Sequence, residues 1–173
     1  MAENLFLRLG RVNGEDHLEW LLLDEASGII RLRGEGNRQA FAQISTSVDI
    51  SGETYVMLRG EDILLTSAKV PSKQPRQILQ AVPFIVEESL AQDVEDCHFA
   101  IGDRNSAGDV NVAIIDRELL QQRLNLLKEL LIQPSIITCD VLQLNALQKN
   151  VGQAEQENSC QVLLEADRAL IRY

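Results

Sequence analysis

The sequence predicts a mixed α/β fold, and three observations taken in chain order support this. The first third alternates strand-like segments with tight turns and one short helix, a pattern typical of a meander. A helix and a strand follow, and residues 110–139 then read as strand, helix and strand. A chain of 173 residues is long enough for one domain, or for two small subdomains that share a core.

The opening meander is predicted from hydrophobic runs separated by turn residues. Asn13-Gly14 and Ser27-Gly28 mark two of the turns, and Asn37 is a candidate N-cap for the short helix. The second strand is apolar enough to predict burial on both of its faces. The expected strands are 5–9, 18–23, 29–33, 54–58 and 63–68, and the expected helix is 37–44.

The later elements centre on a leucine-rich helix at 117–131, which Asp116 is expected to cap and Gln133-Pro134 to end. Its leucines, which include Leu124 and Leu131, repeat at helical spacing and predict a buried stripe. The strands on either side, 110–115 and 135–139, would pair in parallel as a β-α-β crossover. The remaining expectations are a short helix from Asp140 to 147, a polar linker at 149–159 and a hairpin of strands 161–165 and 169–173.

The stretch 68–102 combines a loop with two prolines, a helix, an acidic turn and a strand. Pro83 lies inside the helical pattern, where a proline costs about 3 kcal/mol, so we expect a kink near 79–82. A basic loop with Lys69, Lys73 and Arg76 leads into this helix. Carboxylates crowd its far end and form either a solvated surface or a docking patch for a basic partner: Glu87, Glu88, Asp93, Glu95 and Asp96.

The bulk composition excludes several classes of function. A net charge of −10 and an isoelectric point near 4.6 argue against binding to nucleic acid or to anionic lipid. No apolar run approaches the roughly 20 residues of a spanning helix, and the N-terminus does not read as a signal peptide, so we expect a cytosolic chain. Cys97, Cys139 and Cys160 lack zinc or redox spacing and are expected to be buried thiols.

Catalytic patterns are sparse. Gly34-Glu35-Gly36 suggests a phosphate loop but lacks a third glycine, and we expect a turn there. His17 and His98 have no ligand set of metal-binding spacing around them. His98 and Cys97 would point to opposite faces of a strand and form no dyad. We therefore predict no enzymatic activity, no metal and no cofactor.

The run VPFIVEESLAQDVEDCHFAIG at 82–102 closely resembles the cytoplasmic part of the type II secretion system protein L family, GspL. More distantly, the arrangement resembles the pilus protein PilM and the actin-like ATPases. The resemblance implies a ribonuclease H-like, actin-like first subdomain at 1–66 and 109–148, with a small helix-strand subdomain inserted at 67–108. It further implies a linker at 149–157 and an incomplete second subdomain at 158–173, as in a fragment of a longer protein.

In the actin-like ATPases that the chain resembles, two hairpins with an Asp-x-Gly pattern hold Mg²⁺ and phosphate. The first would fall at Leu7-Arg8-Leu9-Gly10, where Arg8 stands in place of the aspartate. A permanent cation cannot replace an oxygen ligand of a hard metal ion. The second would fall at 164–167, where Glu165 and Asp167 supply carboxylates but the glycine is missing. The resemblance therefore implies a fold without working nucleotide-binding motifs.

The function that the resemblance implies is a non-catalytic scaffold of type II protein secretion. Such a scaffold grips the N-terminal domain of the GspE-like cytoplasmic ATPase and contacts GspM-like and GspF-like platform proteins at the cytoplasmic face of the bacterial inner membrane. The full-length protein is expected to be single-pass, and this fragment to make no membrane contact. Two alternatives stay open: a PilM-like nucleotide-binding protein, and a homodimer formed through the leucine helix around Leu124.

Overall fold

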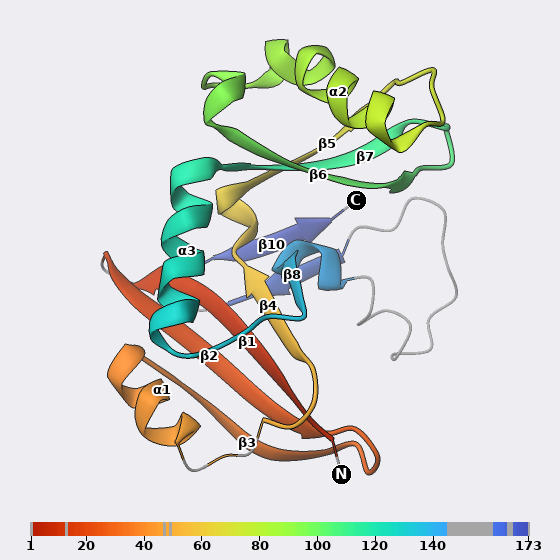
Figure 1. Cartoon of the computed structure of the whole chain (residues 1–173). Helices are drawn as coiled ribbons and strands as arrows, with labels where there is room; N and C mark the ends of the chain where they lie inside the picture. Colours follow the sequence, from red (N-terminus) through yellow and green to blue (C-terminus); the bar gives the residue numbers. More distant parts are fainter. Residues whose placement is uncertain are drawn as a thin grey trace. The chain divides into compact units, whose positions relative to one another are not determined.

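The strands of the described residues form three sheets in the computed structural model of the chain (Figure 1). The structure describes residues 2–12, 14–46, 48, 50–144, 161–165 and 168–172. The chain divides into two compact units. Unit 1 comprises Met1–Gly60 and Leu127–Tyr173, and unit 2 comprises Glu61–Leu126.

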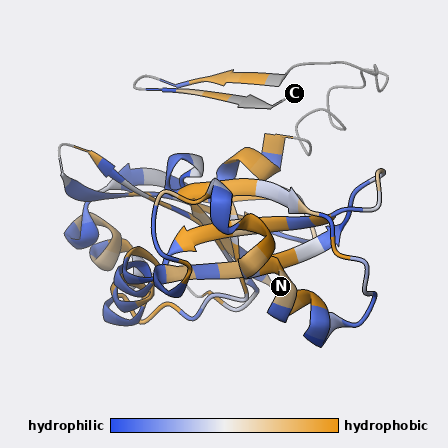
Figure 2. Ribbon diagram, turned by 90° about the horizontal axis from the view of Figure 1, so that it is seen from above, coloured by the Kyte–Doolittle hydropathy of each residue, from blue (hydrophilic) through white to orange (hydrophobic). Residues whose placement is uncertain are grey.

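Unit 1 contains a five-stranded sheet in the order β3-β2-β1-β4-β8. The first three strands are antiparallel, whereas β4 and β8 run parallel to β1. The strands are β1 (Glu3–Val12), β2 (Glu15–Asp24), β3 (Ile29–Gly36), β4 (Thr54–Leu58) and β8 (Ile136–Cys139). Apolar residues are concentrated along the strands, and the turns are largely hydrophilic (Figure 2).

One face of this sheet forms the core of unit 1. Leu7 is fully buried between its partners Trp20 on β2 and Val56 on β4. Helix α1 (Arg38–Ser45) covers this face with Phe41, whose ring meets Trp20 edge-on at 5.4 Å. The side chain of Asn37 accepts a hydrogen bond from the Ala40 N–H, which confirms the expected N-cap.

Unit 2 is built on a three-stranded antiparallel sheet in the order β5-β7-β6. Its strands are β5 (Ile63–Ala68), β7 (Val110–Asp116) and β6 (Cys97–Arg104). Helix α2 (Pro75–Val86) lies across one face (Figure 1) and buries Val82 and Val86 in the same core as Val112 and Ile114. The 3₁₀ turns η2 (Glu87–Ser89) and η3 (Val94–Asp96) connect α2 to β6.

Helix α3 (Arg117–Glu129) begins in unit 2 and ends in unit 1. The Asp116 carboxylate accepts a hydrogen bond from the Leu119 N–H at 2.7 Å, which confirms the predicted cap. Within the expected leucine stripe, Leu126 and Leu127 are buried. Leu131 is not: it lies beyond the helix with 92% of its surface exposed, so its assignment to the buried stripe was wrong.

The predicted β-α-β crossover is also wrong. The strand after α3, β8, pairs in parallel with β4 of the five-stranded sheet and not with β7. Strand β7 lies between β5 and β6, with antiparallel pairing on both sides. Both edges of β7 are therefore occupied, and β8 pairs with the free edge of β4. The expected insertion at 67–108 lies within unit 2, which also contains β5, β7 and most of α3.

Two smaller expectations differ from the structure. Gly34-Glu35-Gly36 belongs to β3 and is not a turn, and a Cβ atom on Gly34 would lie 2.8 Å from the Trp20 ring. The absent side chain thus allows the indole to pack against the strand. Strand β2 alternates in burial, so its predicted burial on both faces is wrong. Pro83 lies inside α2, and the kink near 79–82 stays a prediction.

The remaining elements that the structure describes are two 3₁₀ turns and a C-terminal hairpin. The turn η1 (Gly60–Asp62) precedes β5, η4 (Asp140–Gln143) follows β8, and the predicted hairpin is present as β9 (Gln161–Leu164) and β10 (Ala169–Arg172). The remainder of the expected helix to 147, the linker at 149–159, Cys160 and Tyr173 lie outside the described residues. Among the residues that are described, no helix is both long and apolar enough to cross a membrane.

Candidate functional site

Arg8 is the centre of a cluster of charged side chains in unit 1. It lies in the middle of β1, and side chains alternate along a strand, so it points to the face opposite the buried Leu7 and Leu9. Glu19 is its direct neighbour on β2, and both Glu19 carboxylate oxygens lie within 3.3 Å of Arg8 Nη1. Only 14% of the Arg8 side chain is exposed.

Two carboxylates from distant parts of the chain bind the same guanidinium. Arg8 Nη1 and Nη2 donate to the two oxygens of Glu165 at 2.7 and 2.6 Å, a two-pronged geometry that only arginine can supply. Arg8 Nε donates to Asp140 Oδ2 at 3.1 Å. The turn of the β9–β10 hairpin, the start of η4 and the middle of β1 thus meet at one side chain.

A second arginine closes the network. Arg168 donates through Nε to Glu165 and through Nη2 to Asp140, at 2.7 and 2.5 Å. The other oxygen of Asp140 accepts the Gly60 N–H at 2.9 Å, and 6% of the Asp140 side chain is exposed. We call this set the Arg8 cluster: Arg8, Glu19, Asp140, Glu165 and Arg168.

The electrostatics of the cluster favour a guanidinium that keeps its charge. Burial by itself would lower the pKa of Arg8, but the hydrogen bond to Glu165 and the charges of Glu19, Glu165 and Asp140 raise it above the usual value. Burial raises the pKa of Asp140, and Arg8 and the Gly60 N–H oppose that rise. Because Arg8 stays cationic, each carboxylate retains a charged hydrogen-bond donor.

The Arg8 cluster contains residues of both segments where the resemblance to actin-like ATPases implies damaged phosphate-binding hairpins. Arg8 of the first hairpin binds Glu165 of the second directly, so one side chain bridges the two. Gly10, the glycine of the first pattern, faces Arg59, and a Cβ atom at Gly10 would lie 2.9 Å from Arg59 Cδ. Ala166 and Asp167 of the second pattern lie outside the described residues.

The other residues considered for metal binding or catalysis do not lie together at one site. In the described part of the chain, no group of three or more His, Cys, Asp or Glu side chains could hold a metal ion. Cys97 is buried while His98 is exposed, as expected for opposite faces of β6. Cys139 is also a buried free thiol, and burial raises its pKa.

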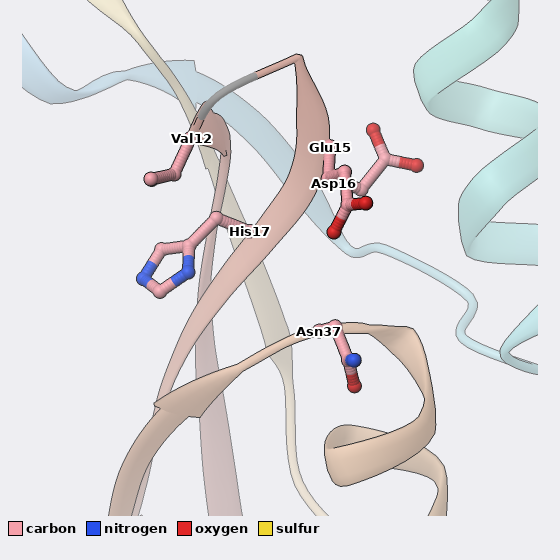
Figure 3. A pocket seen from close by; sticks show the side chains of 5 residues that line it. All are labelled: Val12, Glu15, Asp16, His17 and Asn37. Carbon is pink, nitrogen blue, oxygen red and sulfur yellow. The ribbon is translucent and has the colours of Figure 1, made fainter.

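A pocket of about 360 Å³ lies beside the turn between β1 and β2. Figure 3 shows that His17 and Val12 point to one side of β2, whereas Glu15 and Asp16 point to the other. Asp16 is already bound by Arg38, with its Oδ2 2.5 Å from Arg38 Nη2. The lining groups therefore do not face a common point, and the pocket offers no catalytic arrangement.

The acidic residues singled out in the sequence lie together in unit 2. We call this set the acidic patch: Glu87, Glu88, Asp93, Glu95 and Asp96, all exposed in η2, η3 and the link between them. Among the described residues, no ion pair joins these carboxylates to a cation. The basic loop residues Lys69, Lys73 and Arg76 are exposed at the opposite end of α2.

Sequence reasoning identified Arg8 and Glu165 but missed most of their partners. The sequence analysis expected only a short helix to begin at Asp140 and did not single out Arg168, whereas both are nearly buried members of the Arg8 cluster. A signal was present at Arg8, because an arginine interrupts an otherwise apolar strand and requires buried partners.

Comparison with known proteins points to one family. The family model described as type II secretion system (T2SS), protein L, matches residues 5–168. Type II secretion system protein L of Dickeya chrysanthemi is 26% identical over 94% of this chain and 44% of its own length. The protein of that name from Vibrio cholerae is 30% identical over 74% of this chain and 31% of its own length. The chain thus spans less than half the length of these curated relatives.

Solved structures agree on the fold. The cytoplasmic domain of EpsL, an inner-membrane component of the type II secretion system of Vibrio cholerae, has a TM-score of 0.79 and 26% identity. That match covers 99% of this chain and 67% of the EpsL chain. A chain of the PilM–PilN type IV pilus biogenesis complex has a TM-score of 0.64 at 18% identity, covering 98% of this chain and 60% of that one. A Bacteroides thetaiotaomicron protein with an actin-like ATPase fold scores 0.51 at 9% identity, over 92% of this chain and 60% of its own.

Proposed function

The chain belongs to the type II secretion system protein L family, and we propose that it is a non-catalytic scaffold that recruits the cytoplasmic secretion ATPase to the inner-membrane platform. The observation that carries this proposal is the ion pair between Arg8 and Glu165. Actin-like ATPases hold Mg²⁺ and phosphate between two hairpins, and here an arginine of the first hairpin binds a glutamate of the second. In this proposal the Arg8 guanidinium takes the place of the metal cation, and the Glu165 carboxylate takes the place of the phosphate.

The surface chemistry supports a protein partner. The five carboxylates of the acidic patch are exposed within one short stretch after α2, and the chain has a net charge of −10. A surface of this kind attracts a basic partner and orients it before contact. We propose the acidic patch as the docking surface for the N-terminal domain of the GspE-like ATPase.

The proposal extends to the whole protein. This chain spans 44% of the Dickeya chrysanthemi relative, so the remainder of a full-length protein would carry the membrane helix and the contacts with GspM-like and GspF-like platform proteins. The chain itself would then lie at the cytoplasmic face of the inner membrane, where the export ATPase can reach it.

The direct test is calorimetric titration of the chain with the N-terminal domain of a cognate secretion ATPase. We expect saturable one-to-one binding that weakens as the salt concentration rises. The triple variant Glu88→Lys, Asp93→Lys, Glu95→Lys should lower the affinity at least about tenfold and remove most of the salt dependence.

A matched control separates a specific patch from the overall charge. Glu15→Lys, Glu25→Lys, Glu118→Lys makes the same change in net charge at exposed positions outside the patch. We expect this control to bind almost as tightly as the original chain. Equal losses in the two triple variants would contradict docking at the patch, and absence of binding by the unaltered chain would contradict recruitment by these residues.

The alternative is a PilM-like nucleotide-binding protein, and the fold similarity to PilM is the observation that favours it. A Mg-ATP titration followed by thermal melting distinguishes the two. The scaffold proposal expects no rise in melting temperature, because Arg8 and Glu165 already bind each other. A rise that disappears when EDTA removes the magnesium would favour the alternative.

A further inference from the structure

Helix α2 places an aromatic side chain on the side away from the core of unit 2. Its buried face carries Val82 and Val86, which pack on the sheet. Phe84 follows Val82 by two positions, a turn of about 200° around the helix axis, so it points away from the sheet. Phe84 is 75% exposed and Ile85 beside it is 43% exposed. Large apolar side chains that lie together in water are typical of a binding surface.

The acidic patch begins directly beside Phe84. Glu87 and Glu88 follow Phe84 by three and four positions, the spacing that places side chains on one face of a helix. The turn η2 continues the path of α2, and Glu87 has helical backbone angles of φ −51° and ψ −45°. Phe84 and Ile85 therefore border these carboxylates without an intervening element. An apolar centre with a charged border is the usual anatomy of a protein interface.

Glu87 and Glu88 lie where a carboxylate is electrostatically unfavourable. Carboxylates at the C-terminal end of a helix face the negative end of its macrodipole, and the last turn of α2 contains no basic side chain. Among the described residues, neither glutamate forms an ion pair. A cation on a partner would relieve this repulsion, so the position of the two carboxylates favours a basic partner.

The backbone of the acidic patch is held in place from within unit 2. Arg117 donates through Nε to the Glu95 carbonyl oxygen at 3.2 Å and through Nη2 to the Cys97 carbonyl oxygen at 2.9 Å. The Gln92 amide donates to the Asp116 carboxylate at 3.2 Å and to Cys97 Sγ at 3.3 Å. These bonds fix the link between α2 and β6, whereas the carboxylates of the patch stay exposed. Because the surface is formed before binding, little conformational entropy is lost on association.

We propose that Phe84 is the apolar anchor of the docking surface for the N-terminal domain of the secretion ATPase, and that the acidic patch is the charged border of that surface. This inference rests on the proposed function and adds to it the side chain that supplies most of the affinity. Buried aromatic anchors dominate the binding energy of many interfaces, whereas border charges mainly set the association rate and the salt dependence.

The chemistry of the surface specifies the partner. We expect an apolar pocket on the ATPase domain that receives Phe84 and is bordered by Lys and Arg side chains. A second copy of this chain would bring a second set of carboxylates next to the first, and like charges across an interface are unfavourable. The charge around Phe84 therefore favours a basic partner over self-association.

Calorimetric titration with the ATPase domain at low and at high salt separates the two roles. Phe84→Ala should weaken binding at least about tenfold at both salt concentrations and leave the salt dependence unchanged. The triple variant Glu88→Lys, Asp93→Lys, Glu95→Lys should instead remove most of the salt dependence. Because Phe84 is mostly exposed, Phe84→Ala should not lower the melting temperature of the chain.

The heat-capacity change of binding gives a second readout, which reports the burial of apolar surface. Such burial makes the heat-capacity change negative. Phe84→Ala should make it less negative, and the triple variant of the acidic patch should leave it nearly unchanged. A heat-capacity change that is the same for Phe84→Ala and for the original chain would show that Phe84 stays in water in the complex, and would overturn the proposal.

Leu79→Ala is the matched control on the same helix. Leu79 is 54% exposed and precedes Phe84 by five positions, so it points to a side of α2 that is turned by about 140° from Phe84. This variant should bind within about twofold of the original chain. Equal losses of affinity in Leu79→Ala and Phe84→Ala would overturn the assignment of Phe84 as the anchor.

The outcomes distinguish this inference from the proposed function. If the unaltered chain does not bind the ATPase domain, the proposed function fails and the anchor fails with it. If the chain binds and Phe84→Ala binds equally tightly, only the anchor is overturned. Sedimentation velocity without the ATPase domain is the last check. Loss of a self-associated species in Phe84→Ala, with unchanged ATPase binding, would assign Phe84 to a contact between copies of this chain and overturn the proposal.

Discussion

Arg8 and Glu165 lie 157 positions apart in the chain and meet as a two-pronged ion pair, with N–O distances of 2.7 and 2.6 Å. Glu165 directly follows β9, so the pair ties the C-terminal hairpin to the centre of the five-stranded sheet. Asp140 contributes a third attachment from the end of β8. Arg8 on β1 therefore supplies a positive charge to carboxylates from two segments that are remote from it in sequence.

We first predict that Arg8→Ala destabilises unit 1 strongly. Removing the guanidinium takes one of two cationic partners from both Asp140 and Glu165 and leaves them Arg168, and a buried ion pair that loses one partner costs about 3 kcal/mol or more. Arg11→Ala is the matched control on the same strand, because its side chain is half exposed and its ion pair to Asp16 spans 3.7 Å. Exposed pairs contribute about 0–1 kcal/mol.

Urea denaturation measures both variants. If Arg8→Ala and Arg11→Ala lowered the free energy of unfolding equally, the Arg8 cluster would be no more than a surface network. A loss confined to Arg8→Ala, with unchanged steepness of the transition, would confirm its structural role.

Local signals in the sequence predicted the elements well. Strands β4 and β5 have the predicted bounds, and Asn37 and Asp116 cap their helices as expected. Each of these features depends on residues within about four positions, where hydrogen-bond rules apply directly. Element boundaries near the caps could therefore be read without knowledge of the fold.

Nonlocal pairing could not be read in the same way. Strand β8 could join either β7 or β4, and its short apolar sequence does not distinguish the two. For the same reason, the sequence analysis singled out Arg8 and Glu165 but not the other members of the Arg8 cluster. Asp140 lies 132 positions after Arg8, and no spacing rule links residues so far apart.

We next predict that Gly60→Ala is destabilising although the change is small. A Cβ atom at Gly60 would lie 2.3 Å from Val141 Cγ2 and 3.2 Å from the Asp140 carboxylate. Either the Val141 side chain or the backbone at Gly60, whose N–H donates to Asp140, must shift, and such overpacking costs about 1–3 kcal/mol. Gly102→Ala is the control, since its nearest contacts are an ordinary 3.5 Å from Asn111. Equal melting temperatures for the two variants would contradict this prediction.

The carboxylate of Asp24 gives a prediction that depends on pH. It accepts hydrogen bonds from Arg31 Nη2 at 2.8 Å and from the N–H groups of Ala26 and Ser27. The bond from Arg31, with those from Ser27 and Ala26, holds the pKa of Asp24 below its usual value of 3.8, although burial opposes the shift. The charged form is therefore favoured by folding.

Because the pKa of folded Asp24 lies below the unfolded value, its contribution to stability is complete above pH 3.8 and is lost as the pH falls through the folded pKa. Asp24→Asn should thus lower the urea midpoint at pH 7 and have a smaller effect at pH 3. The exposed Asp103→Asn is the control and should leave the midpoint unchanged at both pH values. An Asp24→Asn effect that stayed constant with pH would show that the charge is unimportant.

The C-terminus of α3 ends in a left-handed residue that is not glycine. Leu131 has a φ of +57°, its N–H donates to the Lys128 carbonyl, and the Ile132 N–H donates to the Leu127 carbonyl. This is the hydrogen-bond pattern of a Schellman motif, in which glycine is preferred at the left-handed position. Leu127 and Ile132, at the two positions whose apolar contact often accompanies that motif, are both buried.

We therefore predict that Leu131→Gly stabilises the protein. A branched side chain in the left-handed region costs about 1–2 kcal/mol, and glycine removes this strain while adding some entropy to the unfolded chain. The net gain should be about 0.5–1 kcal/mol, because Leu131 is 92% exposed and has little packing to lose. Leu131→Ala retains a Cβ atom and should gain almost nothing in urea denaturation. If alanine stabilised the protein as much as glycine, removal of an exposed apolar side chain would be the cause, and backbone strain would not.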